Sequence, residues 1–157
     1  MLSTIAGVPA HPLFVHAAVV FAPLAALISI AWAIRPQAKT LGYTAAAVNL
    51  LSLGFTWLAR SSGETLLKMQ GFTEEDPGPL AKHAEYANYL TGSVIALGAV
   101  VLGFFVISRF VAMPGWLLTL VRVLTIVAAI ALIVTVIMTG HEGAMQVWNN
   151  DETAPAR

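Results

Sequence analysis

Four long apolar segments constrain this chain more than any other feature of its sequence. They cover residues 13–34, 41–59, 87–107 and 116–139, and only the last of them contains a charged side chain, Arg122. Each has about the 20 residues that an α-helix needs to cross the hydrocarbon core of a bilayer. Backbone groups inside lipid must satisfy their own hydrogen bonds, which favours helices. The sequence therefore predicts an all-α fold: an integral membrane four-helix bundle with a short polar cap on its outer side.

The composition supports a single membrane domain. Of the 157 residues, 58% are hydrophobic and only 10% are charged, whereas about a quarter of a soluble domain is charged. We expect one domain, residues 1–157, with spans at about 12–34, 41–60, 84–109 and 115–140 and an outer connection at about 61–80. No basic region precedes the first apolar segment, which is also too long for the core of a signal peptide, so we interpret it as a retained span.

Charged residues are divided unevenly between the two sides of these spans. Arg35, Lys39 and Arg109 lie in or beside the first and third connections, which contain no acidic residue. All acidic residues fall on the opposite side: Glu64, Glu74, Glu75, Asp76, Glu85, Glu142, Asp151 and Glu152. Short cytoplasmic loops carry the excess of Lys and Arg. We therefore expect a bacterial plasma membrane protein with both termini and the connection 61–80 on the outer side.

All four histidines lie on the acidic side as well. His11 and His16 open the first span, His83 opens the third, and His141 closes the fourth. Because odd-numbered spans run inward and even-numbered spans run outward, the four imidazoles are expected at similar heights. Polar and ionisable residues at membrane depth are costly and usually mark a functional site. The sequence therefore predicts a histidine-rich site at the outer face.

Three interpretations of that site remain open. The first is a b-type haem with two axial histidines, placed for electron transfer, with Arg60 or Lys82 near its propionates. The second is a Zn, Cu or Ni ion held by three or four of the histidines, with Glu64, Glu142 or Met145 as a further ligand. The third is a set of interfacial histidines without a cofactor, in a non-catalytic accessory subunit of a membrane complex.

Other functional classes receive little support from the residues. The chain has no cysteine, which excludes disulfides, thiolate metal sites and iron–sulfur clusters held by this chain alone. Its net charge is zero, so nothing indicates nucleic-acid binding. Ser61 and Ser62 lack the Gly-x-Ser-x-Gly context of a hydrolase. An electron carrier or binding protein is expected rather than a hydrolase or transferase, with membrane lipid as a partner and a homo-oligomer left open.

The faces on which the histidines lie are ambiguous in the sequence. At about 100° per residue, His16 lies opposite a stripe of small residues on the first span, namely Ala18, Ala22 and Ala25. His83 lies opposite a similar stripe on the third span, namely Gly92, Ala96, Ala99 and Gly103. Such stripes usually mark close helix–helix contact. Either the histidine faces point into the bundle, or the small faces do.

Three motifs at these positions resemble a bacterial membrane family described as domain of unknown function 2231. They are HPxxVH (His11, Pro12, Val15, His16), a His-Ala pair with a following Asn (His83, Ala84, Asn88), and GHxGAxxVW (Gly140, His141, Gly143, Ala144, Val147, Trp148). The resemblance covers essentially the whole chain. It implies a four-helix membrane protein, sometimes joined to a Rieske-type iron–sulfur domain, and hence redox work. Since this chain has no cysteine, a Rieske-type partner would be a separate protein.

Overall fold

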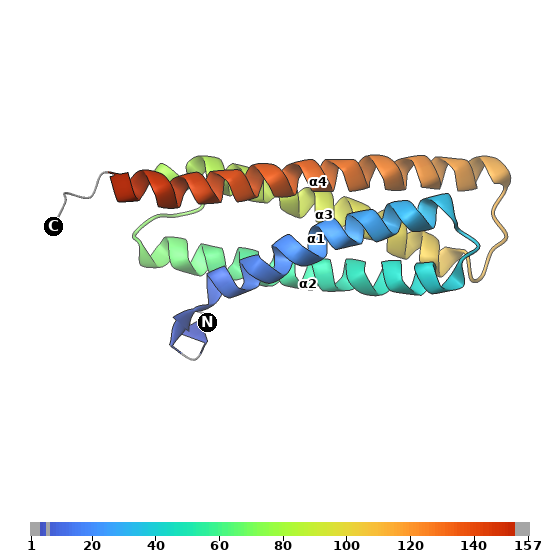
Figure 1. Cartoon of the computed structure of the whole chain (residues 1–157), viewed down its shortest axis with the longest axis horizontal. Helices are drawn as coiled ribbons and strands as arrows, with labels where there is room; N and C mark the ends of the chain where they lie inside the picture. Colours follow the sequence, from blue (N-terminus) through green and yellow to red (C-terminus); the bar gives the residue numbers. More distant parts are fainter. Residues whose placement is uncertain (1–3, 6, 153–157) are drawn as a thin grey trace.

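The chain folds into an all-α four-helix bundle, which confirms the expected fold class (Figure 1). The computed structural model describes residues 4, 5 and 7–152. Its long helices are α1 (Ala10–Ile34), α2 (Lys39–Met69), α3 (Ala81–Ile107) and α4 (Gly115–Glu152). A short 3-10 turn, η1 (Gly78–Leu80), leads directly into α3. Ahead of α1, the two-residue strands β1 (Thr4–Ile5) and β2 (Val8–Pro9) pair antiparallel.

The four helices form a ring in which each packs against its two neighbours. Helix α1 lies against α2 and α4, and α3 lies against the same two helices from the other side. The helices alternate in direction, so the starts of α1 and α3 meet the ends of α2 and α4 at one end of the bundle (left in Figure 1). We call this the histidine end. The opposite end, formed by the connections 35–38 and 108–114, is the basic end.

Two helices extend further than the expected spans. Helix α2 continues through 61–69, which the span boundaries assigned to the outer connection, and α4 continues past residue 140. The segment 61–69 contains good helix formers, and α2 stops just before Gly71, whose φ of +86° suits the left-handed conformation that ends helices. The connection between α2 and α3 is therefore only residues 70–80, including η1. Both extensions lie at the histidine end and form the expected polar cap.

Small buried residues bring α1 and α2 close together. Ala22, Ala26 and Ala45 are each almost fully buried, and a Cβ on Gly42 would lie 3.1 Å from the Trp32 ring. Small residues allow helix backbones to approach, as is common in membrane helix pairs. A polar contact also crosses this interface: the Asn49 amide, 2% exposed, donates to the Ser29 hydroxyl at 2.9 Å.

The outer faces of the bundle are apolar. Large side chains on all four helices are more than half exposed, among them Val20, Leu27, Leu50, Ile95 and Ile137. All four helices are long and apolar enough to cross a membrane. Helices of a soluble bundle would carry charged residues on such faces. This distribution indicates a membrane protein.

Candidate functional site

The structure separates the four histidines into two pairs. His11 and His83 are half-buried within the histidine end, whereas His16 and His141 are exposed. His11 and His16 are five positions apart on α1, about 140° around the helix, so only one of them can face the bundle. The imidazoles therefore do not all converge, and the interior site is built on the pair from α1 and α3.

The small-residue stripes of α1 and α3 lie on opposite sides of the bundle surface: the α1 stripe packs inside and the α3 stripe faces outward. On α1 the stripe packs inside, with Ala22 and Ala25 almost fully buried, and His16 points outward. Nδ1 of His16 donates to the Pro12 carbonyl at 2.6 Å, within its own helix. On α3 the stripe is on the exposed side, Gly92 and Ala96 included. The opposite face of α3, which carries His83, packs inside.

His11 is held by the end of α2. Its Nδ1–H donates to the Ala59 carbonyl at 2.9 Å and lies 3.3 Å from the Ser62 hydroxyl. The ring rests on Gly63, where a Cβ would lie only 2.9 Å from its Cε1 atom. Because a carbonyl oxygen can only accept, this contact places the proton of a neutral His11 on Nδ1. Nε2 then keeps a free lone pair, which is available to a ligand.

His83 occupies the equivalent place between α3 and α4. Its ring rests on Gly143, where a Cβ would lie 3.3 Å from Cε1, and the Thr139 backbone and Glu142 carboxylate lie nearby. Nδ1 of His83 is buried and makes no contact of full hydrogen-bond geometry with a described residue, although the Thr139 backbone lies close enough to hydrogen-bond the imidazole. The His11 and His83 rings are within electrostatic reach of each other. The interior of the histidine end therefore contains two imidazoles, each beside a backbone group of the neighbouring even-numbered helix.

The surroundings of the two rings repeat. Around His11 lie Ala59, Ser62 and Gly63 of α2, and around His83 lie Thr139, Glu142 and Gly143 of α4, at the same spacing. This repetition is not visible as an internal repeat of the sequence, because the repeated contacts use a backbone group and a glycine rather than shared side chains. The only signal was a glycine near the end of each even-numbered helix. Gly63 was therefore not among the expected site residues.

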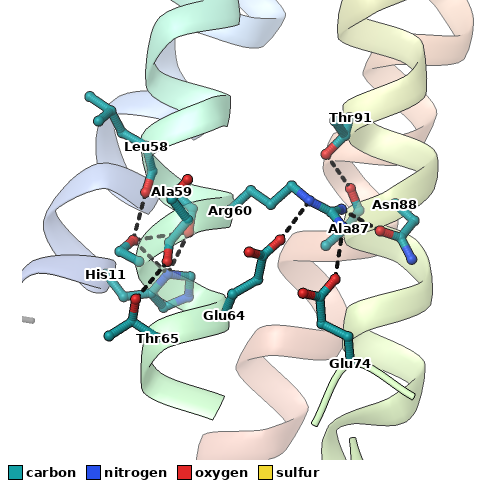
Figure 2. Close-up of polar contacts among 12 residues, drawn as sticks. His11, Leu58, Ala59, Arg60, Glu64, Thr65, Glu74, Ala87, Asn88 and Thr91 are labelled. Carbon is teal, nitrogen blue, oxygen red and sulfur yellow. Dashed lines mark hydrogen bonds and ion pairs between the residues drawn. The ribbon is translucent and has the colours of Figure 1, made fainter. Parts of the chain in front are cut away.

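Arg60 connects the histidine end across α2 and α3 without facing the histidine pair. Its Nε lies 2.9 Å from Glu64 and its Nη2 lies 3.4 Å from Glu74 in the α2–α3 connection. Nη1 donates to the side-chain oxygen of Asn88 on α3. Figure 2 shows Arg60 extending from α2 toward α3, whereas His11 lies on the α1 side of α2. Glu64, expected as a metal ligand, is thus engaged with Arg60.

Lys82 also pairs with an acid. Its Nζ lies 3.3 Å from the Glu142 carboxylate, which is only 16% exposed on its side chain, and Gln146 donates to the Pro79 carbonyl at 2.8 Å. Within residues 4, 5 and 7–152, no group of three or more His, Asp or Glu side chains is arranged to hold a metal ion. The interior polar centre is therefore His11 and His83, with Glu142 at its edge.

Removing the Arg60 side-chain charge should loosen the α2–α3 connection. We expect Arg60→Met to lower stability by about 1 kcal/mol, because each half-exposed ion pair contributes only a fraction of that. The melting temperature in detergent should fall by about 2–4 °C for a chain of this size. Lys68→Met on the same helix is the control, since exposed Lys68 forms no ion pair with another described residue. Equal melting temperatures for the two variants would contradict a connecting role for Arg60.

No family model, curated protein or solved structure matches this chain. The chemistry of the two histidines and their neighbours is therefore the basis for assigning a function.

Proposed function

We propose that this chain is a bacterial plasma membrane protein in which His11 and His83 hold a b-type haem and support single-electron transfer at the outer surface. The hydrogen bond from His11 Nδ1 to the Ala59 carbonyl at 2.9 Å is the observation that carries the proposal. Histidines that bind metals almost always donate their other ring nitrogen to a carbonyl or carboxylate, which orients the ring and makes Nε2 more basic. His11 is already in that arrangement.

The donor set at the histidine end fits a haem better than a bare metal ion. A b-type haem takes only two protein ligands, because the porphyrin supplies the other four nitrogen atoms. A zinc ion needs three or four ligands from the protein. The imidazoles of His11 and His83 are within electrostatic reach of each other, and the described residues form no larger ligand group.

The protein's own residues have separate tasks in this proposal. Gly63 and Gly143 leave room for the two rings beside α2 and α4, and the Ala59 carbonyl fixes the tautomer of His11. Arg60 and Lys82 stay the candidate partners of the haem propionates as cations at this end, although Arg60 does not face the histidine pair and both are paired with acids. A bound haem would supply a one-electron couple, with the apolar helices limiting access of water to the iron.

The orientation in the membrane follows from charge. We place the basic end in the cytoplasm, because the connections there carry Lys and Arg and no acid. Both termini and the histidine end then face outward, so the redox partner is an outer-surface protein, with a Rieske-type protein as the candidate. Membership of the family described as domain of unknown function 2231 is part of the same proposal. It is supported by the position of the resembling HPxxVH and GHxGAxxVW motifs at the histidine end.

One observation favours a second candidate function, a Zn or Cu site. Glu142 is mostly buried on its side chain and its carboxylate lies within electrostatic reach of His83. With His11, these side chains would offer two nitrogen donors and one oxygen donor if they moved closer together. Such a mixed set suits Zn or Cu(II). A non-catalytic accessory subunit, with neither group bound, is the remaining alternative.

An absorption spectrum of the freshly purified protein in mild detergent tests the proposal directly. We expect a Soret band, low-spin α and β bands on reduction, and one haem per chain by pyridine haemochrome assay. Elemental analysis of the same sample measures Zn and Cu. Stoichiometric Zn or Cu without a Soret band would replace the haem by a metal ion. Absence of haem, Zn and Cu, even after haem is added to the purified protein, would leave the accessory role.

A further inference from the structure

A second polar feature lies at the basic end, far from the histidines. A cleft of about 390 Å³ opens between the connections 35–38 and 108–114. It is lined mainly by Pro36, Gln37, Ser108, Met113, Leu118 and Arg122. The lining thus combines apolar side chains with one cation and two neutral polar groups.

Arg122 has no hydrogen-bond or ion-pair partner among the described residues. Its Nε atom is buried without a hydrogen bond, and its guanidinium forms no ion pair with any residue in the described part of the chain. Arginine stays protonated in proteins, and a buried N–H donor without a partner is costly. The segments 10–63 and 86–141 contain no Asp or Glu, so the sequence offers no acid near this end. An anion that pairs with Arg122 would therefore come from outside these segments.

The other cations at the basic end strengthen the local positive potential. Arg35 and Lys39 are exposed on either side of the first connection. Arg109 is engaged separately: it donates to the Tyr43 hydroxyl at 3.0 Å and lies 4.6 Å from the centre of that ring. Arg122 is thus the cation that lines the cleft, and its neighbours draw anions toward it.

We propose that this cleft binds the phosphate of an anionic phospholipid, with Arg122 as the charged contact and Gln37 and Ser108 as neutral hydrogen-bonding neighbours. Basic pockets between membrane helices on the cytoplasmic side bind anionic head groups. Lipid is the source of phosphate favoured here, because Leu118, Met113 and Phe104 line the same cleft and offer apolar contact to acyl chains. The proposal rests on the membrane location of the bundle and is independent of the haem.

Native mass spectrometry of the full chain in detergent measures this binding. The probes are dioleoylphosphatidylglycerol, dioleoylphosphatidylcholine and inorganic phosphate. We expect the wild type to prefer phosphatidylglycerol over phosphatidylcholine. Arg122→Gln should weaken phosphatidylglycerol binding by about 10-fold, equivalent to about 1.4 kcal/mol. Arg35→Gln, which removes an exposed charge at the same end without changing the cleft lining, should change it by no more than about 2-fold because its charge is screened by salt.

Each outcome of these measurements either supports or overturns the proposed lipid site. Loss of the phosphatidylglycerol preference in Arg122→Gln alone supports it, provided that circular dichroism shows the helices intact. Equal binding by Arg122→Gln and wild type, or equal losses in the two variants, would overturn it. In a parallel thermal-shift assay, phosphatidylglycerol should raise the melting temperature of the wild type and millimolar inorganic phosphate should not. Equal shifts with the two probes would mean that the cleft takes a free anion instead of a lipid.

Discussion

His11→Ala and His83→Ala are each expected to abolish retention of haem during purification. In the proposed site each ring would supply one ligand to the iron, and alanine has no donor atom to replace it. Both rings are half-buried on helices that also pack elsewhere, so the bundle should persist without them. The Soret absorbance per chain, normalised to protein mass, is the measurement. Added imidazole should restore part of the low-spin spectrum, because it can occupy the space left by the missing ring.

His16→Ala and His141→Ala are the matched controls for this prediction. Both side chains are exposed, and the His16 ring is bonded to the Pro12 carbonyl of its own helix. Haem content should therefore stay at the wild-type level in these variants. Full haem content in His83→Ala, together with loss in either control, would show that the wrong pair has been identified. Size-exclusion profiles and helix content must match the wild type for the comparison to count.

Gly63→Ala is expected to weaken haem binding by about 10-fold to 100-fold, the usual cost of disturbing a group that orients a metal-binding histidine. The added Cβ would lie 2.9 Å from Cε1 and 3.2 Å from Nδ1 of His11. The ring would have to move, and it would lose its hydrogen bond to Ala59. Titration of haem into the purified protein, followed by the Soret band, measures the affinity.

Two further glycines sharpen this test. Gly54→Ala, on the same helix, meets no atom within 4 Å, so it should leave haem affinity unchanged and raise helix stability by up to about 1 kcal/mol. Gly143→Ala would place its Cβ 3.3 Å from His83, a looser contact, and should weaken binding less than Gly63→Ala does. Equal affinities for all three variants would argue against any ligand held between the two rings.

Several features of the fold followed from the residues alone. Apolar segments of about 20 residues predicted four helices, and the described structure contains them. His11 and His16 are five residues apart, about 140° around a helix, and because α1 begins before both, at Ala10, their side chains lie on different faces. Helix ends were less predictable. The α2 extension contains both a leucine pair and charged residues, so its composition fits a helix above the membrane as well as a loop.

Which residues form the candidate site could not be predicted from the sequence in the same way. Glu64 was an expected ligand, yet it is paired with Arg60, while Gly63 beside it supports the His11 ring. A glycine has no side chain, so its residue type does not indicate such a role. Gly63 matters because it has no Cβ at the place where the His11 ring lies. That contact depends on how α1 packs against α2. Likewise, that Nε of Arg122 is buried without a partner among the described residues depends on the side chains that surround it in the fold.

Hydropathy and charge by themselves determined the number of spans, the gathering of histidines and acids at one end, and the absence of acids at the other. These properties depend only on position along the chain, because each helix advances by a fixed rise per residue. Tertiary structure alone decided which way each helix is rotated. Small-residue stripes pack inside on α1 and outside on α3, which turns His16 away from the bundle and His83 into it. Rotation about a helix axis is set by packing against neighbouring helices, and no single helix encodes it.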